Sequence, residues 1–212
     1  MNEILARLND DALDVLRAVL LAEPPSDIHH DDFTNYPQLR PQGQVEAVEA
    51  AVLLPLILRE TPTLLFTRRT ETLARHSGQV SFPGGRRDAT DLTPVQTALR
   101  ETMEETGIDP AFVSIAGFLP RYRTGTGFDI SPVMGVLAEG FSLVPDPSEV
   151  AEVFEVPLAF FLDPANRKQE SRELGGHMRQ FYAFRPGPHY IWGATAAIIN
   201  DLVSRLVAPD GL

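Results

Sequence analysis

Three glutamates lie close together within residues 94–106, at Glu101, Glu104 and Glu105. Because residues three and four apart share one face of a helix, these carboxylates would crowd a single patch. Like charges at this spacing destabilise an isolated helix by roughly 0.2–0.5 kcal/mol per pair, and within this segment only Arg100 offers compensation. A divalent cation would relieve the repulsion, and oxygen ligands without sulfur favour Mg²⁺ or Mn²⁺. The alternative interpretation is an ordinary solvated acidic face.

The residues around the glutamates predict the helix that must position them. Thr93 and Gln96 form a capping-box pattern, and Pro94 suits the first helical position, where its missing N–H costs nothing. Gly107 can adopt the left-handed conformation that often follows a last turn. We therefore expect a helix over residues 94–106.

The same segment resembles the signature of the Nudix hydrolases. That signature is Gly, five residues, Glu, seven residues, then Arg-Glu-U-x-Glu-Glu-x-Gly-U, where U is a bulky aliphatic residue. Its second half is matched by Arg100, Glu101, Glu104, Glu105, Gly107 and Ile108, with Thr102 in place of the first aliphatic residue. In the first half, the spacer between Gly85 and Arg100 is one residue longer, and Asp91 stands where Glu is expected.

The preceding stretch, "LLFTRRTETLARHSGQVSFPGG" (residues 64–85), resembles the coenzyme A pyrophosphatase branch of this family, whose box carries the longer spacer. The resemblance continues more loosely and covers roughly residues 45–206. It implies an α/β (α+β) fold, a Nudix-type α/β/α sandwich with a mixed β-sheet. It also implies metal-dependent hydrolysis of coenzyme A to 4′-phosphopantetheine and adenosine 3′,5′-bisphosphate.

The resemblance assigns catalytic roles to the helix. Glu101 and Glu105 are expected to be the principal metal ligands, with Glu104 as a third ligand or a partner behind them, and Arg100 would orient Glu104 or Glu101. The chemistry suits these residues, because a pyrophosphate repels hydroxide unless cations neutralise its oxygens and acidify the attacking water. Glu105 also borders the apolar stripe of the helix, so we expect it to be partly buried.

The general base is open at this stage. Glu105 is one candidate, and Glu149 and Glu152 are others, because their segment resembles a family loop that carries an acidic residue into the site. Of the two outside the helix we favour Glu152, since Glu149 fits a solvated loop position.

Further residues are expected to bind the substrate: Arg68, Arg69, Arg75, His76, Gly84, Gly85 and Phe128. The arginines and the histidine could hold the ribose 3′-phosphate of coenzyme A, although each alone fits a surface charge. The two glycines would let the backbone approach metal and phosphates, or would simply form a tight turn. Phe128, after Gly127, resembles a substrate loop of the family, and a buried aromatic residue would look the same.

Hydrophobic patterning predicts the elements around this helix. A helical period over residues 4–20 indicates an amphipathic helix, followed by a polar loop over 23–44. Strands are expected at 48–58, 63–67, 113–120, 130–138, 153–156, 169–174 and 178–184, and further helices at 157–162 and 194–207. We therefore predict an N-terminal extension (residues 1–44) and a Nudix hydrolase domain (residues 45–212).

The composition of the chain indicates which kinds of partner and which compartment to expect. The chain has 212 residues and a formal net charge of −11, which argues against nucleic-acid binding. It has no cysteine, which fits a reducing compartment, and no long apolar run, so we expect neither a signal peptide nor a membrane span and predict a cytoplasmic protein. A homodimer formed through the N-terminal helix is possible, and so is packing of that helix on its own domain.

Two other functions compete with coenzyme A hydrolysis. The first is a Nudix hydrolase of ADP-ribose, a dinucleoside polyphosphate or a damaged nucleotide, with the same fold and metal chemistry. The second is a Nudix-fold module that binds a nucleotide without cleaving it, which loss of one of the three glutamates would signal. All three are present, and no serine-hydrolase or phosphate-binding-loop motif appears.

Overall fold

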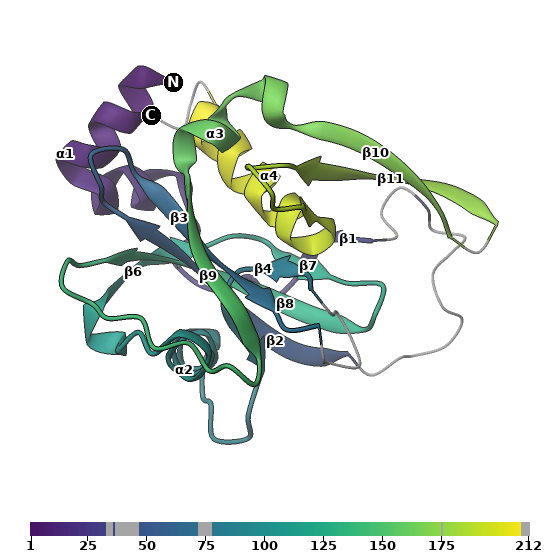
Figure 1. Cartoon of the computed structure of the whole chain (residues 1–212), viewed down its shortest axis with the longest axis horizontal. Coiled ribbons are helices and arrows are strands. Elements are labelled where there is room, and N and C mark those ends of the chain that lie inside the picture. Colours follow the sequence, from purple (N-terminus) through teal and green to yellow (C-terminus); the bar gives the residue numbers. More distant parts are fainter. Residues whose placement is uncertain (33–35, 37–46, 72–77, 175, 209–212) are drawn as a thin grey trace.

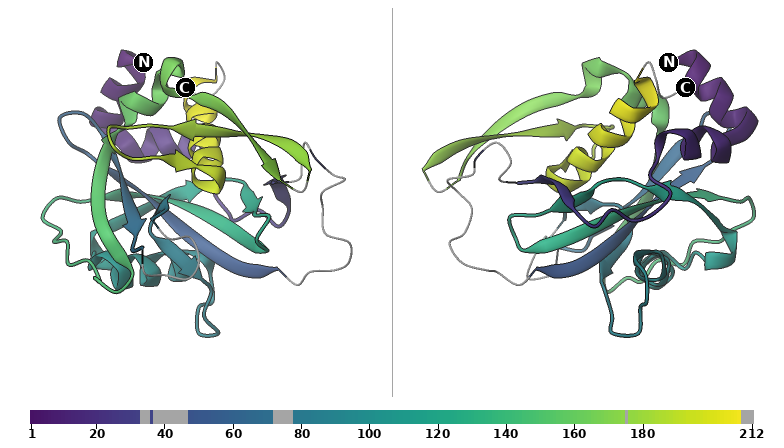
Figure 2. Two further views of the ribbon diagram at one scale, coloured as in Figure 1. Left: turned by 45° about the vertical axis from the view of Figure 1, so that its right-hand side comes forward. Right: turned by 180° about the vertical axis from the view of Figure 1, so that it is seen from behind.

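The computed structural model describes residues 1–32, 36, 47–71, 78–174 and 176–208. Helix α2 (Pro94–Thr106) lies on one face of a large mixed sheet, and α1 (Asn2–Val19) and α4 (Gly193–Val207) lie on the other (Figure 1). The two views in Figure 2 show the same three layers. The predicted sandwich of helices around a mixed sheet is therefore confirmed.

The main sheet runs in the order β1-β7-β8-β2-β3-β4, with β5 also paired to β2, β6 to β8 and β9 to β3. Its strands are β1 (Ile28–Asp31), β2 (Val48–Ile57), β3 (Thr63–Arg69), β4 (Val80–Ser81), β5 (Gly84–Arg86), β6 (Val113–Phe118), β7 (Arg121–Arg123), β8 (Phe128–Leu137) and β9 (Val150–Pro157). A smaller antiparallel sheet contains β10 (Lys168–Leu174), β11 (His177–Phe184) and β12 (Ile191–Trp192). Short helix α3 (Leu158–Leu162) links β9 to this second sheet.

The centre of the main sheet is the parallel pair β2 and β8, which stay in register from Val48↔Phe128 to Ile57↔Leu137. Strand β3 folds back on β2 as an antiparallel hairpin, with Leu56 opposite Leu64. Both strands are covered on both faces, which explains their nearly continuous apolar sequences.

Side chains of β3 alternate between the two faces of the sheet. Leu64 and Phe66 belong to the large apolar cluster that includes α1 and α4. Leu65, between them, packs in the cluster on the α2 side with Ile108. This alternation continues to the end of the strand, where it separates two groups of polar residues.

Helix α1 is part of the same core. Leu8 and Leu16 are fully buried in the cluster shared with α4, and Arg205 of α4 donates a hydrogen bond from Nη1 to the carbonyl oxygen of Val19 (3.2 Å). The helix bends at Asp11, whose φ and ψ of −153° and 84° are not helical. The predicted amphipathic helix is confirmed and packs on its own domain, while the division at residue 44 stays a prediction.

The main differences from the predicted elements are short strands. Strands β4, β5, β7 and β12 were not predicted, because segments of two or three residues are too short to show a period. The predicted polar loop over residues 23–44 was wrong at β1, a four-residue strand that pairs with β7 and has no apolar alternation to signal it. Strand β9 also begins earlier than the predicted 153–156. None of the helices in the described part of the chain has the length and apolar character needed to cross a membrane.

The burial of α1 can be tested at Leu16, whose side chain is 0% exposed. We expect Leu16→Ala to lower the free energy of unfolding by about 2–5 kcal/mol, because it leaves a cavity between α1 and the sheet. Urea denaturation measures the change. The matched control is Leu92→Ala, the same truncation at a side chain that is 77% exposed, which should cost less than about 0.5 kcal/mol. Equal effects of the two variants would show that α1 is not part of the core.

Candidate active site

Helix α2 has the predicted bounds and caps. Thr93 accepts a hydrogen bond at Oγ1 from the backbone N–H of Gln96, and Gln96 accepts one at Oε1 from the N–H of Thr93, both at 3.2 Å. Gly107 follows the last turn with a φ of 76°, in the left-handed region. These caps fix where the helix begins and ends, and hence which face carries each glutamate.

Strand β5 brings two glycines against this helix. The backbone N–H of Gly84 donates to Oε2 of Glu105 at 3.2 Å. A Cβ added to Gly85 would overlap the carboxylate of Glu101, so this carboxylate lies directly against the strand. A Cβ on Gly84 would instead collide with the backbone of β2 at Ala51. Gly85 therefore makes room for a glutamate, and Gly84 makes room for the neighbouring strand.

Glu105 is the most buried of the three glutamates, with 3% of its surface exposed. Burial raises its pKa to about 7, against the opposing effects of the Gly84 N–H and the positive charge of Arg69. Nη1 of Arg69 lies 3.4 Å from Oε1 of Glu105, and its Nη2 lies 3.6 Å from Oε2 of Glu149. Arg69 thus joins the helix to the segment before β9.

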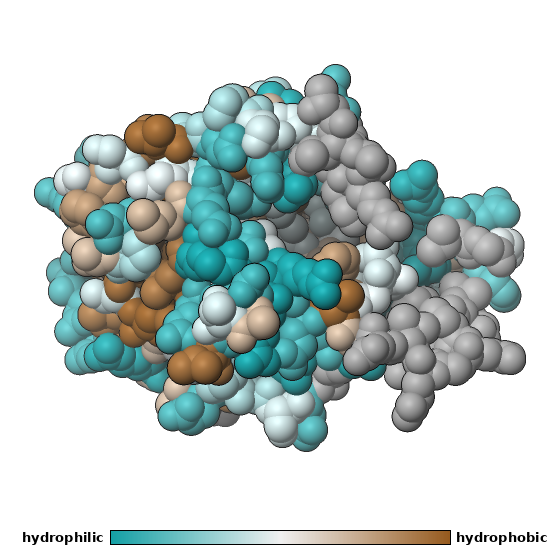
Figure 3. Space-filling view, turned by 90° about the horizontal axis from the view of Figure 1, so that it is seen from below, coloured by the Kyte–Doolittle hydropathy of each residue, from teal (hydrophilic) through white to brown (hydrophobic). Residues whose placement is uncertain are grey.

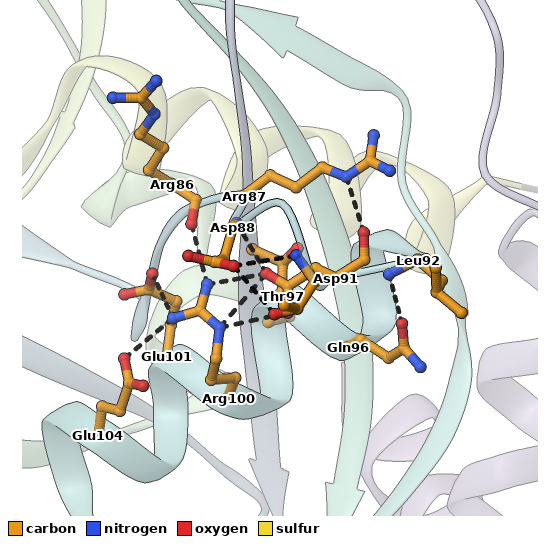
Figure 4. A network of polar contacts seen from close by, with 12 residues as sticks. Arg86, Arg87, Asp88, Asp91, Leu92, Gln96, Thr97, Arg100, Glu101 and Glu104 are labelled. Atoms are coloured by element: carbon orange, nitrogen blue, oxygen red, sulfur yellow. Dashed lines mark hydrogen bonds and ion pairs between the residues drawn. The ribbon is translucent and has the colours of Figure 1, made fainter.

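Arg100 is the centre of a polar network (Figure 4). Its Nη1 donates to Oε1 of Glu101 and to Oε2 of Glu104, both at 2.9 Å. Its Nη2 donates to Oδ2 of Asp91 at 2.8 Å and to the carbonyl oxygen of Arg86 at 3.0 Å. One guanidinium therefore fixes two of the glutamates relative to β5 and to the loop before the helix.

Asp91, for which the sequence suggested no definite role, is the anchor of Arg100. It is 5% exposed and also accepts a hydrogen bond from the backbone N–H of Asp88 at 2.9 Å. The hydrogen bond from Arg100, aided by that of Asp88, lowers the pKa of Asp91 to about 2. The residue at the altered position of the motif thus holds a buried ion pair.

Glu152 and Arg68, which were also predicted to belong to the site, form a separate group. Nε of Arg68 donates to Oε2 of Glu152 at 3.0 Å, and Nε2 of His189 lies 3.1 Å from Oε1 of Glu152. Because Arg68 and Arg69 are consecutive on β3, they point to opposite faces of the sheet, and an irregularity in the β3–β9 register also lies between them. Glu149 therefore lies near the glutamates of α2, and Glu152 lies with Arg68 on the α4 face.

Three predicted residues are not joined to either group. Phe128 begins β8 beside Val48, and no described side-chain contact links it to the glutamates. Arg75 and His76 lie outside the described residues. His189 had no signal in the sequence, because its contact with Glu152 joins residues that are 37 positions apart.

The face of the molecule that carries α2 is polar around this site. Seen from below, hydrophilic side chains form a band across its middle, with hydrophobic ones gathered to the left (Figure 3). Within the described residues no three acids or histidines converge on a single point suited to a metal ion, and Glu101 and Glu104 are both paired with Arg100. Burial nevertheless raises the pKa of Glu101 and of Glu105, so these carboxylates are short of positive charge. Their all-oxygen chemistry fits a divalent cation such as Mg²⁺ or Mn²⁺.

The fold and this glutamate helix are those of the Nudix class of hydrolases. The NUDIX domain family matches residues 47–174. The protein named "Uncharacterized Nudix hydrolase NudL" in Pectobacterium atrosepticum is 41% identical over 198 residues, covering 86% of this chain and 97% of that protein. Its namesake in Escherichia coli is 36% identical over 180 residues, covering 83% of this chain and 94% of that protein.

A solved structure shares the fold. The MutT/nudix family protein from Enterococcus faecalis matches with a TM-score of 0.50 and 14% identity, over 82% of this chain and 66% of that one. The chain belongs to the Nudix hydrolases. It is accordingly a pyrophosphohydrolase of a family that acts on nucleoside diphosphate derivatives and generally uses divalent metal ions.

The Asp91–Arg100 ion pair predicts a pH-dependent contribution to stability. Because the pKa of Asp91 is lowered from 3.8 to about 2, its stabilising effect is complete above pH 3.8 and is lost as the pH falls through 2. We expect Asp91→Asn to lower the free energy of unfolding by about 1–3 kcal/mol at pH 6, with a smaller difference from the wild type at pH 2.5. Urea denaturation at both pH values measures this difference, and a pH-independent difference would contradict the assignment.

Substituting the two glycines of β5 should have different effects, a loss of activity at Gly85 and a loss of stability at Gly84. In Gly85→Ala the atoms nearest to the new Cβ are those of the Glu101 carboxylate, at the end of a flexible side chain, so we expect nearly normal stability. Because Glu101 is displaced, the rate of pyrophosphate hydrolysis should fall by about tenfold or more. In Gly84→Ala the Cβ meets backbone atoms at a positive φ, so stability itself should fall. Thermal unfolding and turnover are measured on both variants. A fully active, stable Gly85→Ala protein would contradict the placement of Glu101.

Proposed function

We propose that this Nudix hydrolase cleaves the pyrophosphate bond of coenzyme A or its derivatives, with Mg²⁺ or Mn²⁺, to give 4′-phosphopantetheine and adenosine 3′,5′-bisphosphate. The observation that supports this substrate is the contact of Arg69 with the buried Glu105. Arg69 belongs to the segment over residues 64–85, which resembles the coenzyme A branch, so part of that segment lies at the glutamates. A cytoplasmic location is part of the same proposal, supported by the absence of cysteine.

In this proposal each residue of the site has a definite task. Glu101, Glu104 and Glu105 would hold the cations, whose charge neutralises the pyrophosphate oxygens and acidifies the attacking water. Arg100 keeps Glu101 and Glu104 oriented, and it can release one of its hydrogen bonds to either as the carboxylates turn toward the substrate. Gly85 leaves the space that the Glu101 carboxylate occupies, and the backbone N–H of Gly84 would orient Glu105.

For the general base, the geometry supports Glu149 over Glu152. Glu149 shares Arg69 with Glu105, whereas both carboxylate oxygens of Glu152 are engaged by Arg68 and His189 on the other face of the sheet. A base must lie within hydrogen-bond reach of the attacking water, directly or through one water. We therefore propose Glu149 as the base, with Glu105 as the candidate inside the helix.

Hydrolysis of ADP-ribose is the second candidate. The observation in its favour is the ion pair between Arg68 and Glu152, which engages an arginine expected to bind the 3′-phosphate of coenzyme A. ADP-ribose lacks that phosphate, so it would not need a free Arg68.

Product analysis separates these candidates. The purified protein is incubated with coenzyme A and, separately, with ADP-ribose, in Mg²⁺, Mn²⁺ or EDTA, and the products are identified by mass spectrometry. Metal-dependent release of 4′-phosphopantetheine, with ADP-ribose cleaved poorly, would support the proposal. The reverse preference would transfer it to ADP-ribose, and no cleavage of either would refute both.

The role of Glu105 predicts the strongest single effect. We expect Glu105→Gln to lower kcat by about 10³-fold or more, because it removes a buried charge that would hold the cation, while the isosteric amide preserves the fold. Thermal unfolding tests the fold and metal-dependent turnover tests the chemistry. The matched control is Glu139→Gln, the same change at an exposed residue, which should leave kcat unchanged. An active Glu105→Gln enzyme would remove the basis of the assignment.

A further inference from the structure

A cleft of about 530 Å³ lies at the carboxyl end of β3, beside the Arg68–Glu152 pair. It is lined by Arg68, Gly78, Gln79, Val80, Glu152, Pro188, His189, Tyr190 and Trp192. Four of these nine residues, from Pro188 to Trp192, come from the connection between β11 and β12 or from β12 itself, beyond the residues 47–174 that match the Nudix family. The cleft has the size of a small-molecule site and has no place in the metal chemistry of α2.

The C-terminal wall of this cleft is aromatic and firmly held. Tyr190 and Trp192 are two residues apart, and their rings are nearly parallel, at 14°, with centroids 6.3 Å apart. The hydroxyl of Tyr190 donates to Oε2 of Glu170 at 2.7 Å, and the guanidinium of Arg185 lies 4.1 Å from the centre of its ring. His189 stacks on Phe154 at 3.6 Å and 4°. Flat, fixed rings of this kind are suited to stacking on another flat ring.

The charges around the cleft are already balanced within the protein. Glu152 accepts from Arg68 and faces His189, and Glu170 pairs with Arg185 at 3.0 Å. The hydrogen bond from Arg68, with that of His189, lowers the pKa of Glu152, so this carboxylate is ionised at neutral pH. Paired arginines are poorly suited to a phosphate, whereas each oxygen of the Glu152 carboxylate has a second lone pair and can still accept a hydrogen bond from an amino group. The balance favours an uncharged, planar ligand with an N–H donor.

We propose that this cleft binds the heteroaromatic base of the nucleotide half of the substrate, an amino-substituted purine such as adenine. The base stacks on Trp192 and directs its exocyclic amino group to Glu152. The cleft and the glutamate site lie on the two faces of one strand end, because Arg68 lines the cleft, Arg69 contacts Glu105, and consecutive side chains of a strand point to opposite faces. As a substrate site this inference rests on the proposed function, but base binding can be measured without hydrolysis.

Trp192 provides a direct readout, because it is the single tryptophan of the chain. In EDTA, AMP is titrated into the full-length protein while tryptophan emission is followed, with ribose 5-phosphate as the control that lacks the base. We expect AMP to quench the emission saturably at concentrations below about 10 mM, with a dissociation constant on the order of micromolar to millimolar. Ribose 5-phosphate should cause no change. Absence of quenching by AMP, or equal quenching by ribose 5-phosphate, would overturn the proposal.

Variants separate stacking from simple loss of structure. Trp192→Phe keeps an aromatic face and Trp192→Ala removes it, so calorimetry should show AMP affinity falling roughly 5- to 100-fold in the alanine variant and much less in the phenylalanine variant. In turnover assays Trp192→Ala should raise KM and leave kcat nearly unchanged. Equal AMP affinities of the two variants and the wild type would refute the role of Trp192.

The binding test and the function test fail independently. Glu105→Gln is expected to abolish turnover and to keep the AMP-dependent quenching, because Glu105 lies on the other face of β3. If the wild type binds AMP but cleaves no nucleotide, the proposed function fails and the base site stands. If it cleaves coenzyme A without AMP-dependent quenching, the proposed function stands and the base site fails.

Discussion

The guanidinium of Arg100 is the interaction on which the arrangement of the site depends. It has a planar set of donors, and the structure uses them on Asp91, Glu101, Glu104 and the backbone of β5. Three carboxylates on one face of a helix would otherwise repel one another. A lysine could supply the charge but not the several directed hydrogen bonds, so charge alone does not explain the residue at this position.

Acidic and basic side chains around Arg100 form ion pairs, although the chain carries a net charge of −11. Asp91 is ionised because Arg100 faces it, whereas Glu105, with Arg69 at 3.4 Å and little solvent, holds its proton at much higher pH. Two carboxylates on the same layer of the fold therefore differ widely in proton affinity. The one with too little compensating charge lies where a cation would be needed, and the fully compensated one serves as a structural anchor.

Helix α2 could be predicted to the residue because its signals are local. The capping box of Thr93 and Gln96 and the glycine after Thr106 act within one turn, and tertiary packing did not override them. The choice between Glu149 and Glu152 could not be made in this way. Which acid meets which arginine depends on the register of β9 against β3, which has an irregularity between Arg68 and Arg69, and a one-residue register shift leaves no trace in the composition. His189 and the short strand β5 were missed for the same reason, since only long-range contacts define them.

The packing of α1 on α4 also has a consequence for the order of folding. Val19 and Arg205, which are hydrogen-bonded, are 186 positions apart, so the contact between α1 and α4 cannot form until the last helix has been made. At 5–20 residues per second this interval is about 9–40 s on the ribosome, far longer than helix formation or chain collapse. During synthesis the part of α1 that packs on α4 therefore stays exposed on the nascent chain, while its contacts with the sheet can form earlier.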